Sequence, residues 1–572
     1  MSRRPHASRA IALGMMAAVA VAGCSSTDDP DAPPRQDMPP ESTPAPDATE
    51  GIDPELEKYY TQTLEWEDCG DEFQCSTLTV PLNYAEPDAG DIELSLLRVP
   101  ASSDEPSGSL VVNPGGPGAS GVDYARNAHV VASEQVLEQY DIVGFDPRGV
   151  GGSTPIECLD DSSLDEFLSD PPGDDDGSDD ADSGDDGGED TGAQDDADGS
   201  DDTGADDTGG EDSGGEDAGT DDGDADDTDD TAAAIAEQAE EFAQACESRS
   251  GELLEHIGTA DVSRDLDVLR SALGDEALNY LGKSYGTLIG AVYADLFPER
   301  AGRLVLDGAI DPTLEAAEVA LGQARGFERA LDAYLDWCLD NDCPLGDTEE
   351  DARASLASLM AQTEEEPLPT GQESRPLTAS LAFYGIILPL YLAPDQGYPT
   401  LSEALDKAVN EDDGSVLLQL ADLYLNRNAD GTYNGNQNEA IIAVNCLDYP
   451  EGTTVEEAQA ALPQFEEASP IFGEYLAWSG LACSEWPAES DFDLSDIDGA
   501  GADPILVVGT TGDPATPYAW AESLADQLES GVLLTFDAFG HTAYMSGSDC
   551  VDEAVDDYLL NGTVPENDRT CS

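Results

Sequence analysis

Short apolar runs alternate with amphipathic segments along most of the chain. Eight of these runs are rich in β-branched, leucine and aromatic residues, which predicts β-strands. The later runs are continuously apolar, as expected for strands that helices cover on both faces. The expected strands span residues 76–82, 92–99, 109–113, 140–145, 278–282, 303–307, 504–509 and 532–536. The pattern therefore predicts an α/β fold built on a sheet of about eight strands.

A second unit is expected between the sixth and seventh strands, which are separated by roughly two hundred residues. Apolar positions recur there every three to four residues, for example over 401–409 and 455–462, a spacing typical of amphipathic helices. We predict a helical unit inserted into the sheet domain.

A low-complexity segment at residues 174–230 interrupts the sheet domain after the fourth expected strand. It holds 28 acidic residues in 57 positions and no apolar residue larger than alanine, so it cannot bury surface. It contains no EF-hand loop, and the chain has no Cys-x-x-Cys pair or histidine cluster. The sequence therefore predicts a solvated polyanionic loop, with neither a metal nor another cofactor.

The whole chain is acidic, because 125 Asp and Glu residues against 21 Lys and Arg residues give a net charge of −104 over 572 residues. Outside 174–230, 97 acidic and 21 basic residues still leave −76. This charge repels nucleic acids and anionic membrane surfaces, so no nucleic-acid partner is expected. An acidic surface with only three lysines indicates a saline or alkaline environment, where salt screens the self-repulsion.

The amino-terminal residues are typical of an export signal. Three arginines precede an apolar run over 11–23, which is too short to span a bilayer and ends in Val-Ala-Gly before Cys24. This ending resembles a bacterial lipobox, which predicts cleavage before Cys24 and a lipid on its thiol; an ordinary secretory signal is the alternative. Residues 25–53 are rich in Pro, Asp, Ser and Thr and are expected to form a disordered tether. The protein is therefore expected outside the cell membrane, anchored to it by lipid alone or secreted.

Eleven cysteines fit an exported protein. If Cys24 is acylated, an even number of ten remains, and their spacing suggests that nearest neighbours pair, although connectivity does not follow from sequence alone. The expected disulfides are Cys69–Cys75, Cys158–Cys246, Cys338–Cys343, Cys446–Cys483 and Cys550–Cys571.

Residues 282–286 read Gly-Lys-Ser-Tyr-Gly, the only Gly-x-Ser-x-Gly in the chain. The segment follows an expected strand and begins an amphipathic helix that ends before Pro298. In a nucleophile elbow the serine lies on a tight, strained turn from strand to helix, which requires small residues on both sides. Ser284 is therefore the candidate nucleophile.

A serine nucleophile needs a base, and the base needs an orienting carboxylate. Of the four histidines, only His541 follows a late strand and lies downstream of an acid, Asp513, that also follows a late strand. The order Ser284, Asp513, His541, each just past a strand's carboxyl end, is the order in an α/β-hydrolase chain. The alternatives are structural: Asp513 as a helix cap and His541 as an ordinary core residue.

Residues 113–118, Asn-Pro-Gly-Gly-Pro-Gly, directly follow the third expected strand. Glycines there let backbone N–H groups approach a developing oxyanion without interference from side chains. We expect an oxyanion hole made of one amide from Gly115 or Gly116 together with that of Tyr285. A plain turn is the alternative.

Five segments together resemble the actinobacterial tripeptidyl aminopeptidases, which are proline-iminopeptidase-like serine peptidases of the α/β-hydrolase fold. The segments are N-P-G-G-P-G-A-S-G, D-I-V-G-F-D-P-R-G-V-G-G-S, G-K-S-Y-G-T, G-D-P-A-T-P and F-G-H. The resemblance runs from about Tyr59 to Cys571 and leaves out the acidic segment. It implies an α/β-hydrolase core with the helical unit as a cap, and a secreted or cell-surface enzyme that removes short peptides, often tripeptides, from free amino termini. It also implies that Ser284 is acylated, that His541 acts as base and then acid, and that Asp513 orients it.

An exopeptidase must bind the α-ammonium of its peptide or protein substrate, and a cap carboxylate is the natural counter-charge. Asp448, Glu439 and Glu485 are the candidates, and Asp448 is favoured because the expected Cys446 disulfide would fix its position. Each is alternatively a solvated acid.

Two other motif residues are expected to be structural. Arg148 should pin its loop, and Thr516 should cap a helix that has Pro517 at its first position.

Seven segments make up the expected domain organisation. They are a signal peptide (1–23), a disordered tether (24–53), the first part of the core (54–160), the acidic insertion (161–230), the core with the elbow (231–312), the helical cap (313–499) and the last part of the core with Asp and His (500–572). Two other functions stay open. A carboxylesterase or lipase would use the same triad, because the fold does not set the leaving group. A non-catalytic acidic surface lipoprotein would use no triad.

Overall fold

The computed structural model describes most of the chain. The described residues are 41–46, 48–71, 73–103, 105–169, 223–450, 452–488, 490 and 492–572, with side chains of the helix at 223–250 from residue 232 onward. The expected signal peptide, Cys24 and the acidic segment up to residue 222 lie outside these residues.

A mixed sheet of ten strands forms the core, in the order β12-β11-β10-β9-β8-β6-β7-β5-β4-β3. Strands β6 to β12 are mutually parallel, and β3, β4 and β5 are antiparallel to their neighbours. The strands are β3 (Glu67–Asp68), β4 (Gln74–Pro81), β5 (Asp91–Val99), β6 (Ser109–Asn113), β7 (Asp141–Phe145), β8 (Leu278–Lys283), β9 (Ala301–Asp307), β10 (Ile505–Gly512), β11 (Gly531–Phe539) and β12 (Arg569–Cys571). All eight expected strands are present. The two additional strands, β3 and β12, are short edge strands without an apolar run.

Helices cover both faces of this sheet, which explains why the central strands are continuously apolar. Every residue of β6 and β7 is buried. One hydrophobic cluster joins the sheet to α7 (Thr259–Leu273), α8 (Tyr285–Leu296) and α17 (Tyr518–Gln527). Another joins the opposite face to α2 (Gly121–Arg126), α3 (Ala128–Val131), α4 (Glu134–Gln139) and α18 (Asp549–Asn561).

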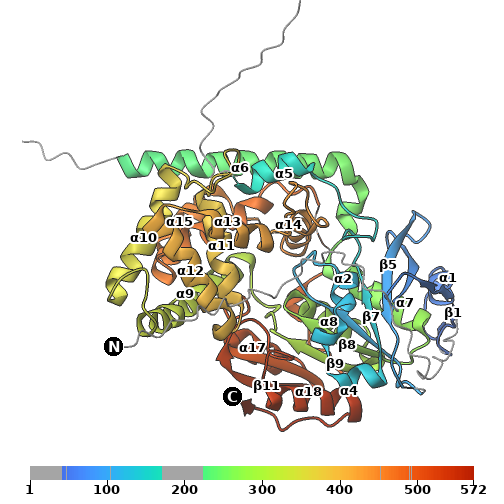
Figure 1. Ribbon diagram of the computed structural model, residues 1–572. Helices are drawn as coiled ribbons and strands as arrows, with labels where there is room; N and C mark the ends of the chain where they lie inside the picture. The colour runs from blue at the N-terminus through green and yellow to red at the C-terminus, as the bar shows by residue number, and fades with distance from the viewer. Residues whose placement is uncertain are drawn as a thin grey trace, which may run out of the picture. The chain divides into compact units, whose positions relative to one another are not determined.

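The expected helical unit follows β9 and precedes β10 (Figure 1). It has a hydrophobic cluster of its own, centred on α9 to α13. Its helices are α9 (Ala316–Asp340), α10 (Glu349–Glu365), α11 (Ala379–Tyr391), α12 (Pro394–Glu411), α13 (Ser415–Tyr424), α14 (Gln437–Asp448), α15 (Val455–Ala468) and α16 (Gly473–Trp478). We call this unit the cap.

The acidic insertion expected over 161–230 is too long at both ends. Residues Asp161–Ser169 form α5, whose leucines are buried in the cap cluster because they follow a helical apolar spacing. Asp165 of this helix pairs with Arg375 and Arg427 of the cap. At the other end, α6 (Gly223–Ser250) begins before residue 230 and runs along the cap beside α5 (Figure 1).

The tether expected over 24–53 also extends too far. Within the described residues, β1 (Glu41–Ser42) pairs with β2 (Leu64–Glu65), and α1 (Glu57–Tyr60) lies between these two strands in the chain. The Ala45 amide donates to the Ser271 carbonyl, and Trp66 Nε1 donates to Ser42 Oγ. Backbone groups and one serine make these contacts, so the low apolar content of the segment did not reveal them.

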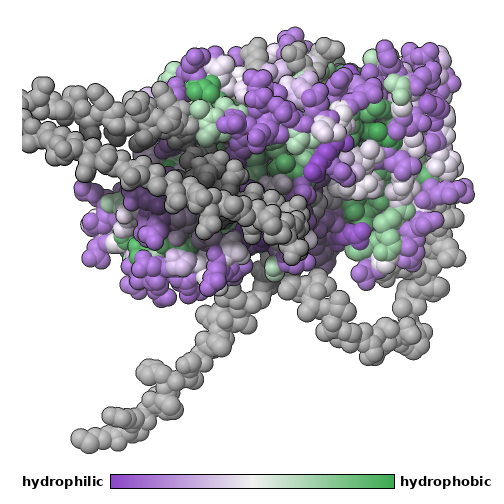
Figure 2. Space-filling model, turned by 90° about the horizontal axis from the view of Figure 1, so that it is seen from above, coloured by the Kyte–Doolittle hydropathy of each residue, from purple (hydrophilic) through white to green (hydrophobic). Residues whose placement is uncertain are grey.

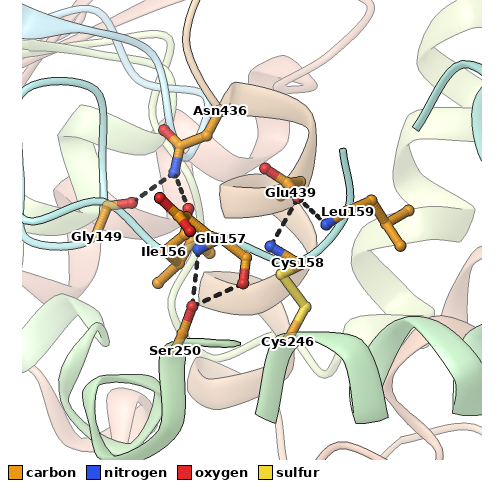
Figure 3. The surroundings of a disulfide bond; sticks show 9 residues. All are labelled: Gly149, Ile156, Glu157, Cys158, Leu159, Cys246, Ser250, Asn436 and Glu439. Carbon is orange, nitrogen blue, oxygen red and sulfur yellow. Dashed lines mark hydrogen bonds between the residues drawn. A yellow bond between two sulfur atoms is a disulfide. The ribbon is translucent and has the colours of Figure 1, made fainter. Parts of the chain in front are cut away.

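The five expected disulfides are all present, which confirms the nearest-neighbour pairing. Cys158–Cys246 ties the segment before α5 to α6 (Figure 3). This link and the Asp165 ion pairs fix both sides of the acidic insertion to the cap and core.

The surface agrees with the acidic composition. Figure 2 shows a mostly hydrophilic face on which hydrophobic side chains form small, separate groups. Large apolar side chains that are exposed among the described residues are Val130, Leu423, Phe539 and Val564. No described helix has the length and apolar composition that crossing a bilayer requires.

Candidate active site

Ser284 lies on the sharp turn between β8 and α8. Its backbone has φ +54° and ψ −126°, a region that non-glycine residues rarely adopt. The Ser284 amide donates to the Asp307 carbonyl over 2.9 Å, and its carbonyl accepts the Thr287 amide over 2.8 Å. This strained, doubly held turn is the geometry of a nucleophile elbow.

The glycines on either side of Ser284 are required by space. A Cβ on Gly282 would lie 2.3 Å from the Gly286 carbonyl oxygen. A Cβ on Gly286 would lie 2.8 Å from Asn113 Oδ1. A side chain at Gly282 would therefore force the turn open, and one at Gly286 would push the elbow away from the end of β6.

His541 and Asp513 meet at the carboxyl ends of β11 and β10. The His541 Nδ1 atom is 2.9 Å and 3.0 Å from the two Asp513 carboxylate oxygens. The Asp513 side chain is fully buried and also accepts the amides of Ala515, Thr516 and Thr542. With its orientation set by three backbone donors, the carboxylate can hold one tautomer of the imidazole.

His541 and Ser284 both lie near the carboxyl end of β9. The Ser284 amide is bonded to Asp307, and a Cβ on the next residue, Gly308, would be 3.4 Å from His541 Cε1. Within the described residues, the His541 ring bonds to Asp513 and approaches Thr516. A contact from histidine to serine often tightens only when substrate binds.

Of the two glycine amides expected at the candidate oxyanion hole, one already has a partner. The Gly115 amide donates to Asn113 Oδ1 over 2.9 Å, so this N–H is not available to an oxyanion. Gly116 is the remaining candidate of the two, because its amide has no bond to another described residue. A Cβ on Gly115 would lie 3.0 Å from the Tyr285 nitrogen, so the loop meets the first turn of α8 where the two amides are needed.

Gly115→Ala is expected to lower kcat/KM by about 10²–10³-fold, the effect of losing one oxyanion donor. The new Cβ would lie 2.5 Å from the Lys283 carbonyl and 2.9 Å from Ser284 Cβ, so the loop must move away from the elbow. Gly70→Ala is the matched control: its φ of +94° resembles the +97° of Gly115, but nothing lies within 4 Å. Steady-state kinetics on a peptide anilide and thermal unfolding measure the two effects. A Gly115→Ala enzyme as active as the Gly70→Ala enzyme would contradict this prediction.

The cap supplies a contact to His541 that sequence reasoning missed. Tyr391, the last residue of α11, accepts the His541 amide with its carbonyl over 2.8 Å. Its ring stands at 90° to the imidazole, with 5.4 Å between ring centroids. No motif marks Tyr391, because the contact depends on how the cap packs on the core.

Thr516 is not a helix cap, which corrects the expectation. Helix α17 begins at Tyr518 with Pro517 as its N-cap residue. Thr516 instead donates its amide to Asp513, and its Oγ1 lies 3.4 Å from His541 Nδ1. The tight turn that Asp513 stabilises holds Thr516 in the site, so the helix begins only after it.

Asp448 borders a cavity of about 870 Å³ between the cap and the segment after β9. Its two oxygens accept the Thr259 amide over 2.9 Å and the Thr259 hydroxyl over 2.5 Å, and Thr259 Oγ1 is 2.6 Å from the Tyr285 hydroxyl. Burial raises the pKa of Asp448 to about 6, against the opposing effect of the Thr259 hydrogen bonds. No basic side chain of the described residues forms an ion pair with it. Within that part of the chain, Asp448 is thus a buried carboxylate without a cation.

The other two amine candidates are placed differently. Glu439 accepts the amides of Cys158 and Leu159 with one oxygen, beside the disulfide (Figure 3). Glu485 is exposed. Neither belongs to the residues that line the 870 Å³ cavity.

Arg148 is a structural pin, as expected. Its guanidinium is fully buried and pairs with Asp265 over 2.7 Å. It also donates to the carbonyls of Pro81, Leu82 and His256. No group of three His, Cys, Asp or Glu side chains in the described part of the chain is arranged to hold a metal ion.

Comparison with known proteins agrees with this geometry. The family described as TAP-like protein matches residues 469–571, and the alpha/beta hydrolase fold family matches residues 108–350. The chain is 34% identical over 509 residues to the serine protease Hip1 of Mycobacterium tuberculosis, covering 87% of each protein. It is 31% identical over 526 residues to the tripeptidyl aminopeptidase of Streptomyces coelicolor, covering 89% of this chain and 86% of that protein. It is also 33% identical over 507 residues to the carboxylesterase B of Mycobacterium tuberculosis, with 87% and 86% covered.

Proposed function

Because the chain belongs to the tripeptidyl aminopeptidase family of α/β-hydrolase serine peptidases, we propose that it releases short peptides, chiefly tripeptides, from free amino termini. The observation that carries this proposal is a strained Ser284 and a His541–Asp513 pair, combined with the buried carboxylate of Asp448. Asp448 borders a cavity, and no cation among the described residues neutralises it. The amino-terminal sequence supports a location outside the cell membrane, with Cys24 as the site of a lipid anchor.

The proposed reaction proceeds through an acyl-enzyme. Ser284 Oγ attacks the scissile carbonyl while His541 Nε2 accepts its proton, and Asp513 stabilises the imidazolium that forms. The amides of Gly116 and Tyr285 bind the oxyanion. His541 then protonates the leaving amine, and a water molecule releases the short peptide by the reverse sequence.

Asp448 is the proposed site of the substrate's α-ammonium. The substrate would supply the positive charge that the buried carboxylate lacks among the described residues. Two hydrogen bonds, of 2.5 and 2.6 Å, and one tyrosine side chain connect Asp448 to the Tyr285 backbone next to the nucleophile. This short connection supports an amine site within a few residues of the scissile bond, as release of a short peptide requires.

Acetylating the amino end of a tripeptide anilide is expected to lower kcat/KM by about 10²–10³-fold, because one member of a buried charge pair is lost. Asp448→Asn should lower kcat/KM for the free substrate to a similar level and leave that for the acetylated substrate nearly unchanged. Asp493→Asn is the matched control, since Asp493 lines the same cavity but is exposed. For the wild type and each variant, kcat/KM for the free and for the acetylated substrate is measured by anilide release, which gives four values per double-mutant cycle.

Thermal unfolding separates binding from folding in this test. Because burial raises the pKa of Asp448 above its unfolded value, its ionisation opposes folding above about pH 6. Asp448→Asn should therefore unfold at the same or a higher temperature at pH 8. Equal cleavage of free and acetylated peptides and of simple acyl esters would favour the carboxylesterase alternative. An amine preference that survives Asp448→Asn would keep the exopeptidase and move the amine site elsewhere.

A further inference from the structure

A buried ion pair lies beneath the loop that carries His541. Lys283 ends β8 and Asp307 ends β9, and the two residues are register partners in adjacent parallel strands. Lys283 Nζ is 3.6 Å from Asp307 Oδ2, with exposed side-chain fractions of 13% and 0%. Neither residue takes part in the bond-making and proton-transfer steps assigned to Ser284, His541 and Asp513.

Both members of the pair hold the backbone just after His541. The Asp307 carboxylate accepts the Ala543 amide over 2.9 and 3.1 Å and the Tyr544 amide over 2.9 Å. Lys283 Nζ donates to the Tyr544 carbonyl over 2.7 Å and approaches Thr542 Oγ1 at 3.4 Å.

That backbone needs support, because it contains two non-glycine residues with positive φ. Thr542 has φ +67° and Met545 has φ +63°. Each such residue is strained and persists only where its surroundings hold it. The hydrogen bonds with Asp307 and Lys283 fix Ala543 and Tyr544, the two residues between Thr542 and Met545.

The same pair is bound to the nucleophile. Lys283 immediately precedes Ser284, and the Asp307 carbonyl accepts the Ser284 amide over 2.9 Å. One residue therefore bonds the elbow with its backbone and the histidine loop with its side chain. Asp307 does not bond to the His541 ring, which Asp513 already occupies.

We propose that Lys283 and Asp307 are positioning residues, which set the His541 loop at a fixed distance from Ser284 so that the base can reach the nucleophile. The pair acts through backbone contacts and touches neither substrate nor reacting atoms. This positioning role rests only on the Ser284–His541 chemistry of the proposed function and not on the tripeptide specificity.

The effect of losing one member follows from burial. Removing one charge leaves the other buried without its counter-ion, whereas removing both leaves a neutral pair that still fills the space. Asp307→Asn keeps one oxygen for the loop amides, and Lys283→Met keeps the length of the side chain. The double variant should therefore lose less activity than the two single losses multiplied together.

The test uses the rate of Ser284 labelling by a fluorophosphonate, together with kcat and KM on a tripeptide anilide. Each single variant is expected to lower the labelling rate and kcat by about 10–100-fold with KM nearly unchanged, since a shift of about 1 Å costs up to 10²-fold. The double variant should recover part of this loss. Lys58→Met is the matched control, because Lys58 forms an exposed pair with Asp91.

The rate of labelling per active site supplies a readout that a purely structural role would not move. Partial unfolding lowers the amount of protein that is labelled, whereas a misplaced His541 slows the labelling of every folded molecule.

The outcomes are distinguishable from failure of the proposed function. Wild-type protein that is not labelled would refute the serine hydrolase itself. The positioning role would be overturned if the wild type is labelled and the variants keep its labelling rate, or lose activity only in proportion to their unfolded fraction. If a single variant does not fold, the neutral double variant and the charge-preserving Lys283→Arg test the positioning role by the same labelling rate.

Discussion

Ser284→Ala is expected to lower kcat/KM for a tripeptide anilide by on the order of 10⁶-fold, because the nucleophile is lost. The alanine side chain fits the elbow, because it removes only the hydroxyl from a position where the backbone already holds φ +54°. The Asp307 carbonyl would still accept the residue 284 amide, so the fold should persist. The remaining rate should reflect only the oxyanion amides and substrate binding.

The measurement combines kinetics with covalent labelling. A fluorophosphonate should label the wild-type protein at Ser284, located by peptide mass spectrometry, and should not label Ser284→Ala. Ser358→Ala, a change at an exposed serine of α10, should keep both activity and labelling. Absence of labelling in the wild type would revive the non-catalytic surface lipoprotein, and labelling of a different serine would move the nucleophile.

Much of the core could be predicted from sequence because its signals are local. Strands such as β6 and β7 are buried along their full length, so their apolar runs mark them without reference to the rest of the chain. The elbow is equally local, since Gly282 and Gly286 lie within two residues of Ser284 and are required by contacts that the turn itself creates.

The parts that sequence did not reveal depend on contacts between distant segments. The Gly115 amide donates to Asn113 Oδ1, which leaves Gly116 of the two expected glycine donors, and this bond is visible only in the folded loop. Helix α5 packs on the cap, where Asp165 forms ion pairs with two arginines that are more than two hundred residues away in the chain. Edge strand β12 is polar and short, and its pairing with β11 gives it no apolar signature.

The proposed amine site shows the limit of reasoning from charge in an acidic chain. Asp448, Glu439 and Glu485 could not be ranked by composition, because any carboxylate in such a sequence is most simply a solvated one. The structure separates them by their surroundings. Glu439 accepts two backbone amides, and Glu485 is exposed to solvent. Asp448 borders a cavity, and no cation among the described residues pairs with it.

Asp513→Asn is expected to lower kcat by about 10⁴-fold, or about 5 kcal/mol of transition-state stabilisation, with little change in KM. The cause lies in the donors around the side chain. One Asp513 oxygen accepts two backbone amides, so the asparagine oxygen should take that position and its NH₂ group the other. The NH₂ group would then face His541 Nδ1 and the Thr542 amide, both of which now donate to a carboxylate.

His541 would respond by changing tautomer. Its Nδ1 lies 2.9 Å from one Asp513 oxygen and 3.0 Å from the other, so it would meet both the oxygen and the NH₂ group of the asparagine. In the molecules where Nδ1 accepts from the NH₂ group, the proton moves to Nε2 and the ring can no longer take the proton of Ser284. Fluorophosphonate labelling should slow by a similar factor, and thermal unfolding should show a folded protein, because only the Thr542 contact is lost outright. Asp526→Asn, at an exposed aspartate of α17, serves as the control and should behave as wild type. A variant at residue 513 that keeps more than a tenth of the wild-type kcat would show that another group orients His541, and Asp307 would be the first to test.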